Sequence, residues 1–211
     1  MRMSLAEQVY RTLEAAIADG RCRPNQRLVE QDIARDLGIS RTPVRQALQR
    51  LAAEGFVSSA RQAWTVREHT RNEIEQLFEV RIALESHAAL LAAERITRAE
   101  LDALQEVHER SLTCVDAASR AELVQRNSEF HSGVLRAAAN PPLEDLARQY
   151  HRHYFNQRTA RQYSDEQATT ALAQHGQILD ALRDHDGCRA RAAVIAHLET
   201  SREAALQTAP G

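Results

Sequence analysis

The sequence contains no lysine, so each of its 27 fixed side-chain cations is an arginine. It has only three cysteines, at positions 22, 114 and 188, and none of them forms a CxxC pair. This sparse cysteine usage fits a reducing cytoplasm. No apolar run reaches the length of a membrane span, and the N-terminus lacks a signal-peptide core. We therefore expect a cytoplasmic protein with no membrane partner.

Aromatic residues are also scarce, at 4% of the chain, whereas Ala, Leu, Arg, Glu and Gln dominate and favour helices. A length of 211 residues fits one large domain or two small ones. The net charge of -2 excludes an overall polycation, but the charge is unevenly distributed. Residues 1–68 carry 11 Arg against 8 acidic residues, and the rest carries 16 Arg against 21. This asymmetry indicates two modules with different partners.

The first third of the chain has the pattern of a winged helix-turn-helix. The stretch SLAEQVYRTLEAAIADG predicts a helix that ends at Gly20. A short helix, VEQDIARDLG, then stops at Gly38, and a second helix, ISRTPVRQALQRLAAEG, follows at once and ends at Gly55. The stretch FVSSARQAWTVRE alternates well enough for a two-stranded hairpin, the wing. We expect this DNA-binding domain to occupy residues 1–68.

The start of the second short helix is the predicted DNA-reading surface. A recognition helix enters the major groove with its N-terminal residues nearest the bases, and here these are Ser40, Arg41, Thr42 and Arg45. Arginine can pair with guanine through two hydrogen bonds, while small hydroxyls can hold phosphates. For this segment alone, the alternative is an amphipathic helix with a solvated arginine face. The helix before it and the hairpin after it favour DNA recognition.

The stretch LVEQDIARDLGISRTPVRQALQRLAAEGFV closely resembles the winged-helix domain of GntR-family bacterial transcription regulators, and the resemblance covers residues 4–67. It implies that Arg41 and Arg45 contact operator bases and that Ser40 and Thr42 contact the DNA backbone. The wing departs from the family pattern, which has a glycine at its tip after a basic residue. Here Arg61 is followed by Gln62, which can still donate a hydrogen bond in a minor groove. A backbone that needs a positive φ would be strained at that position.

From about residue 69 onward the pattern becomes purely helical. Capping-box patterns begin at Thr97, Ser119 and Ser164, and the connections are short, which favours neighbouring antiparallel helices. We therefore expect a mainly α protein whose second domain, residues 69–211, is an antiparallel all-α bundle of about six helices. The predicted helices span residues 71–94, 97–116, 119–138, 142–158, 164–184 and 188–206.

Polar residues interrupt the apolar stripes of this second domain. In LVQRNSEFHSGVL, Asn127 and His131 lie one turn apart on the apolar face. His175 lies within the stripe of ATTALAQHGQILDAL, His197 within that of RARAAVIAHLETS, and Arg81 within that of NEIEQLFEVRIALESHAALL. Burying one such group without a partner costs about 1–3 kcal/mol, and an unpaired charge costs more. Several of them on facing helices indicate that they partner one another or a shared guest.

A metal site is one interpretation of these residues. Asn127 and His131 can direct two ligand atoms to one point, and His175 and His197 can complete the site from two further helices. Three imidazoles and an oxygen suit a borderline divalent ion such as Zn²⁺, Ni²⁺ or Mn²⁺. A single buried histidine is more often a hydrogen-bonded core residue, but three of them on three stripes favour a common site.

The motifs EVRIALE, NSEFH, AQHGQIL and AHL resemble the FCD effector domain of FadR-type GntR regulators over residues 71–206, and six helices match its shorter, VanR-like branch. In that family an aspartate and three histidines bind a metal that often helps to hold a small carboxylate effector. Asn127 stands in the aspartate position, so a charge is lost, a carbonyl oxygen is kept, and metal affinity should fall. The resemblance implies that Arg81 faces the pocket, and the alternative for it is an i,i+4 ion pair with Glu85.

These features together predict a ligand-responsive transcription regulator and not an enzyme. One domain would bind operator DNA, and the other would sense a small molecule, by resemblance a carboxylate, and form the interface of a homodimer. Two alternatives stay open. One is a metal-dependent enzyme fused to a DNA-binding domain, although Glu129 would point away from the face of Asn127 and no good general base is found. The other is a DNA-binding dimer without an effector, whose polar residues satisfy only one another.

Overall fold

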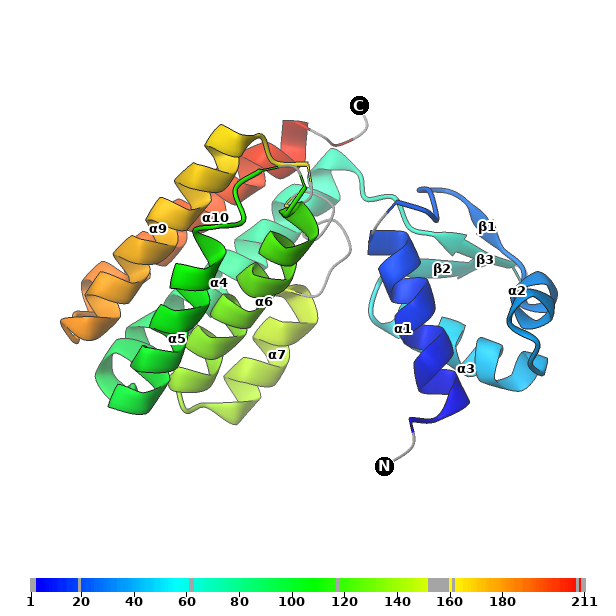
Figure 1. Ribbon diagram of the computed structural model, residues 1–211, viewed down its shortest axis with the longest axis horizontal. Coiled ribbons are helices and arrows are strands. Elements are labelled where there is room, and N and C mark those ends of the chain that lie inside the picture. The colour runs from blue at the N-terminus through cyan, green and yellow to red at the C-terminus, as the bar shows by residue number, and fades with distance from the viewer. Residues whose placement is uncertain are drawn as a thin grey trace. The chain divides into compact units, whose positions relative to one another are not determined.

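The computed structural model of the protein describes residues 3–18, 20–60, 63–116, 118–151, 160, 162–207 and 209. These residues form two compact units, one that ends at His69 and one that begins at Thr70, and each has its own hydrophobic core (Figure 1). Helices dominate the chain, so the predicted mainly α fold class is confirmed. No helix among the described residues is long and apolar enough to cross a membrane.

The first unit is a helix-turn-helix followed by short strands. Its described elements are α1 (Leu5–Ala18), β1 (Arg27–Leu28), α2 (Glu30–Leu37), α3 (Arg41–Ala53), β2 (Val57–Ala60) and β3 (Ala63–Val66). α2 ends at Gly38, whose φ of 66° turns the chain into α3 with little strain. α3 buries Val44, Leu48 and Leu51 in a core shared with α1. This burial leaves the opposite face of α3 in solvent, as a recognition helix requires.

The wing differs from the predicted two-stranded hairpin, because the described residues form a sheet of three antiparallel strands. β2 and β3 pair as expected, but β1 pairs with the other edge of β3, so that Leu28 lies opposite Trp64. The sequence does not predict β1, since two residues are too few to show alternation. Arg61 and Gln62, the predicted wing tip, lie outside the described residues.

The second unit is a bundle of helices. Its described helices are α4 (Arg71–Arg95), α5 (Arg98–Ser111), α6 (Arg120–Ala137), α7 (Pro141–His151), α9 (Asp165–Arg183) and α10 (Gly187–Gln207). Each matches one of the six predicted helices. α5 ends five residues earlier than predicted, because the side chains of Ser111, Thr113 and Cys114 bond back to carbonyl groups of its last turns. The predicted end of the fourth helix, at residue 158, lies outside the described residues.

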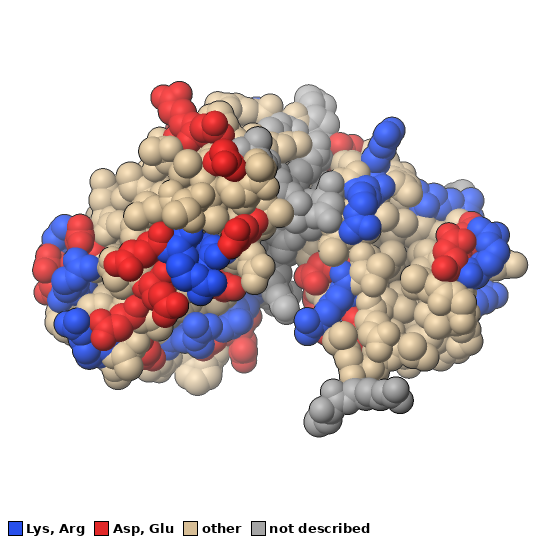
Figure 2. Space-filling model, in the orientation of Figure 1, with Lys and Arg blue, Asp and Glu red and all other residues tan. Residues whose placement is uncertain are grey.

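α4 is the central helix of this bundle and packs against α6, α7, α9 and α10. Its fully buried alanines at positions 88, 89, 92 and 93 are small enough to let these neighbours approach closely. In Figure 1, α5, α6 and α7 lie side by side on one side of α4, and α9 lies beside α10. Acidic and basic side chains intermingle over the visible face of this unit (Figure 2). The bundle therefore brings the stripes of α4, α6, α9 and α10 to one interior.

The helix caps explain where several of these helices begin. The predicted capping boxes at Thr97 and Ser164 are both present. The predicted box between Ser119 and Glu122 is absent, and the Ser119 hydroxyl donates to the carboxylate of Asp116 at 2.7 Å. The backbone of Ser119 is also not extended as in a typical capping residue, with φ −92° and ψ 3°, and the Glu122 N–H group donates to the Ser119 carbonyl oxygen at 3.0 Å instead of to the hydroxyl.

Candidate DNA-binding surface and histidine cluster

The predicted DNA-reading residues lie together at the N-terminal end of α3. Arg41, Thr42 and Arg45 are exposed, and the arginine side chains have 59% and 52% of their surface in solvent. Ser40 occupies the N-cap position with extended backbone, but its side chain makes no capping hydrogen bond. Ser40 therefore begins the helix without capping it through its side chain. The residue is exposed, so its hydroxyl is accessible to a ligand.

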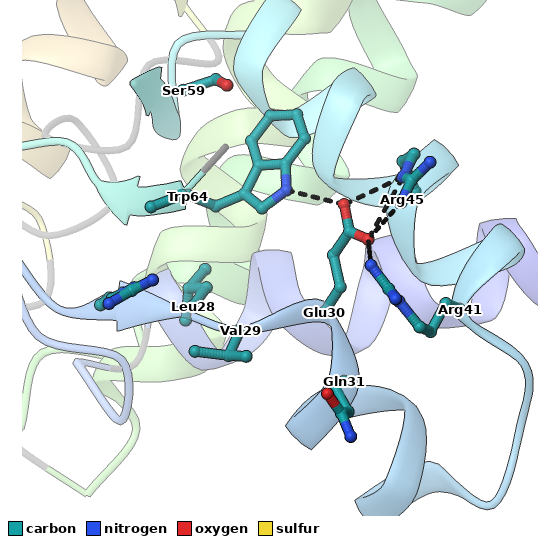
Figure 3. Close-up of a pocket in the computed structure, with 10 residues that line it drawn as sticks. Leu28, Val29, Glu30, Gln31, Arg41, Arg45, Ser59 and Trp64 are labelled. Carbon is teal, nitrogen blue, oxygen red and sulfur yellow. Dashed lines mark hydrogen bonds and ion pairs between the residues drawn. The ribbon is translucent and has the colours of Figure 1, made fainter. Parts of the chain in front are cut away.

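A single carboxylate connects the two arginines. Glu30, the first residue of α2, accepts from Arg41 Nη2 at 3.1 Å and from Arg45 Nε and Nη2 at 3.1 and 2.9 Å (Figure 3). The indole N–H group of Trp64 on β3 also donates to Glu30, at 3.1 Å. These bonds, those from Arg45 foremost, lower the pKa of Glu30 to about 2, so this carboxylate stays ionised at physiological pH.

These residues surround a cavity of about 400 Å³ between α2, α3 and the sheet. Its lining includes three arginines, Arg27, Arg41 and Arg45, and the indole ring of Trp64. The sequence does not indicate the roles of Glu30 and Trp64, because they are 34 residues apart and belong to elements whose contact only the fold reveals.

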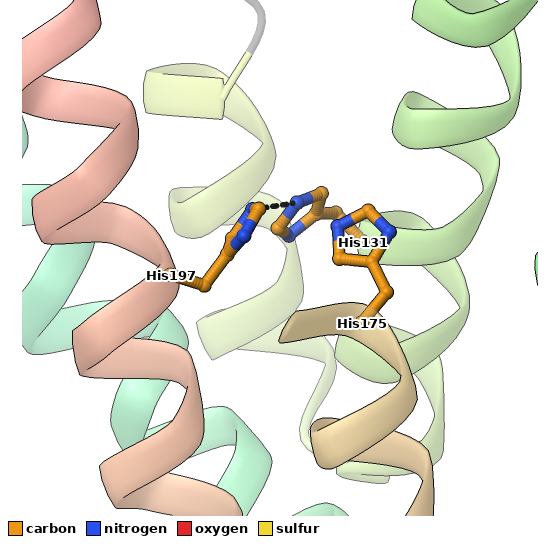
Figure 4. Close-up of side chains that lie close together, drawn as sticks. All are labelled: His131, His175 and His197. Carbon is orange, nitrogen blue, oxygen red and sulfur yellow. Dashed lines mark hydrogen bonds between the residues drawn. The ribbon is translucent and has the colours of Figure 1, made fainter. Parts of the chain in front are cut away.

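The three predicted metal-binding histidines converge inside the second unit. His131 on α6, His175 on α9 and His197 on α10 are all buried, with exposed fractions of 5%, 2% and 2%. One potential ligand atom from each lies within 4.8 Å of the others, and the Nε2 atoms of His131 and His197 are 3.2 Å apart. Figure 4 shows the three rings gathered at one point between the helices. Three stripes that the sequence places on separate helices therefore meet at one cluster.

Neighbouring hydrogen bonds determine which nitrogen of His197 carries its proton. The Thr200 hydroxyl donates to the Ala196 carbonyl oxygen at 3.1 Å, so it accepts from the Gln174 amide nitrogen at 2.9 Å. The Gln174 amide oxygen therefore faces His197 Nδ1, 3.1 Å away, and this nitrogen must donate. A neutral imidazole that donates through Nδ1 keeps its lone pair on Nε2, the atom that faces His131.

Glu85 on α4 orients His131 in a similar way. Its Oε2 lies 3.1 Å from His131 Nδ1, and its Oε1 accepts from Arg81 Nε at 2.8 Å. Arg81 and Glu85 are both buried, so the ion pair that the sequence leaves as an alternative for Arg81 is present. A carboxylate beside Nδ1 favours the proton on that nitrogen and the lone pair on Nε2, the arrangement typical of metal-binding histidines.

His175 contributes the strongest evidence that the cluster fits a metal ion. Its buried Nε2 has no hydrogen-bond partner among the described residues. Burial, followed by the neighbouring His197 and His131, lowers the pKa of His175 well below its usual value, so the ring is neutral. The ring stacks on Phe130 with the centroids 4.2 Å apart, which fixes its direction. A buried ring nitrogen without a partner is costly, and a cation that bound its lone pair would satisfy it.

The distance between two of the nitrogens supports the same conclusion. Two imidazole nitrogens bound tetrahedrally to one zinc ion at about 2.0–2.1 Å lie about 3.3 Å apart. The Nε2 atoms of His131 and His197 are 3.2 Å apart. Asn127, the predicted fourth ligand, is half-buried one turn before His131, and its part in the cluster stays a prediction. Gln174 and Glu85 complete the surroundings of the cluster, and only the fold reveals that they contact its histidines.

Two family models match the chain. Residues 5–66 match "Bacterial regulatory proteins, gntR family", and residues 76–200 match the FCD domain. The two matches cover the helix-turn-helix with its wing and the helical bundle that holds the three histidines. The resemblance inferred from the sequence motifs is confirmed for both parts of the chain.

Curated relatives agree with these models. The Nta operon transcriptional regulator of Aminobacter aminovorans is 30% identical over 193 residues, which cover 90% of this chain and 89% of that protein. The HTH-type transcriptional regulator McbR of Escherichia coli (strain K12) is 31% identical over 148 residues, covering 70% of this chain and 67% of McbR. The solved structure of E. coli McbR/YncC shares the fold, with a TM-score of 0.79 at 24% identity over 98% of this chain and 99% of that one. The chain belongs to the GntR family of bacterial regulatory proteins, and it is a DNA-binding transcription regulator with an FCD effector domain.

Proposed function

We propose that this regulator reads its operator through Arg41 and Arg45, and that its FCD domain holds a divalent metal ion and responds to a small carboxylate. The observation that carries the second part is the convergence of three buried imidazoles, one ring nitrogen of each lying within 4.8 Å of the others. The first part is supported by two exposed guanidinium groups at the N-terminal end of α3. Ser40 and Thr42 would hold backbone phosphates beside them, with Arg61 and Gln62 as further candidates on the wing.

The DNA-reading proposal is tested with duplexes that the protein itself selects from a randomised library. Replacing Arg41 or Arg45 with Ala should reduce the affinity for the selected duplex far more than that for a scrambled duplex, measured at the same salt concentration. An arginine that contacts only phosphates would lose affinity equally for both duplexes. Equal losses would therefore contradict a role for that arginine in reading bases.

His131, His175 and His197 would supply the nitrogen ligands of a Zn²⁺, Ni²⁺ or Mn²⁺ ion, and Asn127 a neutral oxygen ligand. Bound there, the ion would supply positive charge to which a carboxylate can coordinate. Glu85 and Gln174 would keep the Nδ1 protons of two of these histidines in place. Thermal melts of the metal-stripped chain with each ion test this, because an ion that binds the native state raises the melting temperature. The metal-dependent rise should disappear in His175→Ala.

A carboxylate effector is supported by the groups beside this cluster. Arg81 carries a fixed positive charge and lies next to the cluster, since its partner Glu85 also contacts His131. The cavity between Glu85, His131 and neighbouring apolar side chains has a volume of only about 10 Å³, about the room of one water molecule. An organic effector near the cluster would therefore require helices to move. Such a movement gives the effector a means to favour one conformation over another.

The family resemblance also suggests a homodimer, since a two-fold protein matches a palindromic operator with half-sites one helical turn apart. Sedimentation of the DNA-free chain at micromolar concentration should show a dimer, and a monomer alone would contradict this. An enzymatic role receives less support, because Glu85, the carboxylate beside His131, is engaged by Arg81 and is poorly placed to act as a general base.

A further inference from the structure

Glu30 forms ion pairs with both of the arginines that are proposed to read bases. The residue begins α2, the arginines belong to the first turns of α3, and the third donor, Trp64, belongs to β3. One carboxylate therefore connects the helix-turn-helix to the wing sheet (Figure 3). The contact is more than a surface ion pair, because only 13% of the Glu30 side chain is exposed.

The bonding pattern leaves one side of each guanidinium available. A guanidinium has five N–H donors in a fixed plane. Arg45 gives Nε and Nη2 to Glu30, and Arg41 gives Nη2, while more than half of each side chain remains in solvent. The remaining N–H groups are the ones that could meet a guanine edge. The carboxylate thus restrains both arginines without covering them.

We propose that Glu30 is a positioning residue for operator recognition, which holds Arg41 and Arg45 in the orientation that reads bases, while Trp64 anchors the carboxylate to the wing. The proposal rests on the proposed DNA-reading role of the two arginines. Its physical reason is preorganisation: a long side chain that is already ordered loses less conformational entropy when it binds. The carboxylate would therefore increase selectivity although it is a negative charge near DNA.

Electrostatics alone would give the opposite expectation, and this difference makes the proposal testable. Neutralising Glu30 removes one negative charge from the surface, so attraction to phosphates should increase on any duplex. If the carboxylate only competes with DNA, its removal should tighten binding to the selected duplex as well. If it positions the arginines, its removal should weaken binding to the selected duplex relative to random DNA.

The experiment uses the full chain, a duplex that the wild type selects from a randomised library, and a scrambled duplex of the same length and composition. We expect Glu30→Gln to reduce the ratio of the two affinities about tenfold, a loss within the range of one bidentate base contact. The affinity for the scrambled duplex should stay equal or rise. This affinity should fall between 50 and 200 mM salt at least as steeply as it does for the wild type. Asp32→Asn is the matched control, since Asp32 is an exposed acid on the same helix that pairs with Arg35 instead.

Trp64→Phe provides a second variant in case Glu30→Gln does not fold. It keeps an aromatic ring in the sheet and removes the N–H donor together with part of the indole ring, so the affinity ratio should fall about two- to threefold, as expected for one modest hydrogen bond. Trp64 is also the sole tryptophan of the sequence. Its fluorescence in the DNA-free chain should therefore shift in Glu30→Gln and stay unchanged in Asp32→Asn.

The positioning role is supported if Glu30→Gln loses selectivity and Asp32→Asn keeps it. It is overturned if Glu30→Gln keeps the ratio within twofold, if it binds the selected duplex more tightly with an equal or higher ratio, or if Asp32→Asn loses as much. A wild type that enriches no sequence would instead contradict the proposed DNA-reading function itself. The two failures are thus distinguishable in one set of measurements.

Discussion

The two units of this regulator each contain a glutamate that binds arginine, yet the surroundings give the two ion pairs different tasks. Glu30 in the winged helix-turn-helix binds two arginines that remain more than half exposed. Glu85 in the FCD domain binds Arg81 in the buried interior, where the exposed fractions of the two side chains are 4% and 5%. Both contacts join a carboxylate to a guanidinium. They differ in the surroundings of the polar atoms that the ion pair leaves over.

At the surface, the remaining N–H groups of the arginines face solvent, where they are available to a ligand. In the interior, the second oxygen of Glu85 faces His131 Nδ1 and orients its ring. A buried ion pair is a poor source of net stability, because desolvation offsets much of the attraction. Its presence beside three imidazoles therefore indicates that it serves the arrangement of the histidine cluster.

The largest expected effect is on stability and should separate the two glutamates. Glu85→Ala leaves the Arg81 charge buried without its carboxylate, which should cost about 3–5 kcal/mol of unfolding free energy. Glu30→Ala should cost only a small part of that, since both arginines can be hydrated. Urea unfolding followed by circular dichroism measures both variants. Similar losses would contradict the contrast between a buried and an exposed pair.

A second effect concerns only the DNA-binding surface. Arg45→Ala should reduce the preference for the selected duplex over scrambled DNA by about five- to a hundredfold, the range of one bidentate contact with guanine. Arg35→Ala is the control, because Arg35 lies on α2 and pairs with Asp32 rather than with Glu30. Competition binding at fixed salt gives the ratio directly. A control that loses as much selectivity as Arg45→Ala would show that general charge dominates.

A smaller effect concerns the metal affinity of the histidine cluster. Asn127→Asp adds a negative charge next to His131 and should tighten the binding of Zn²⁺, Ni²⁺ or Mn²⁺ at least about tenfold, or about 1.4 kcal/mol. Isothermal titration of the metal-stripped chain measures the change. Glu129→Gln, two residues further along α6 and exposed, is the control. An affinity that does not respond to Asn127→Asp would mean that position 127 takes no part in the site.

The smallest expected effect is an absence of pH dependence at the DNA-binding surface. Arg45, Trp64 and Arg41 lower the pKa of Glu30 to about 2, so the carboxylate stays charged over the working range. Because the folded pKa lies below the unfolded one, the contribution of Glu30 is complete above about pH 4.5 and is lost as the pH falls towards 2. The selectivity difference between wild type and Glu30→Gln should therefore stay constant from pH 8 to pH 5. A difference that titrates near neutral pH would contradict this.

The sequence predicts those parts of the molecule that a repeating pattern determines. Apolar periodicity predicts the helices of the bundle, and it identifies His131, His175 and His197 as polar residues on buried faces. Conversely, β1 is too short to show a pattern, and Ser119 makes no capping bond because its backbone is not in the extended conformation of a capping residue. Both failures arise from local details that a repeating pattern does not report: a strand of only two residues and the backbone conformation at one position.

The residues that orient the others cannot be predicted from one stripe. Gln174 precedes His175 in the chain but contacts His197 on another helix, and Glu30 meets Trp64 across 34 residues. Adjacent residues on a helix point about 100° apart, so their partners depend on which helices surround them. Periodicity therefore finds the cluster, and only the packed fold reveals what holds its rings in place.

The metal content of the purified chain tests the central proposal most directly. Wild type, His175→Ala and Arg45→Ala are each exposed to Zn²⁺, separated from excess ion, and measured by elemental analysis. We expect about one ion per chain in wild type and in Arg45→Ala, and much less in His175→Ala, because one nitrogen ligand is lost. Equal metal in His175→Ala and wild type, or none in any of the three, would contradict a metal ion at the histidine cluster.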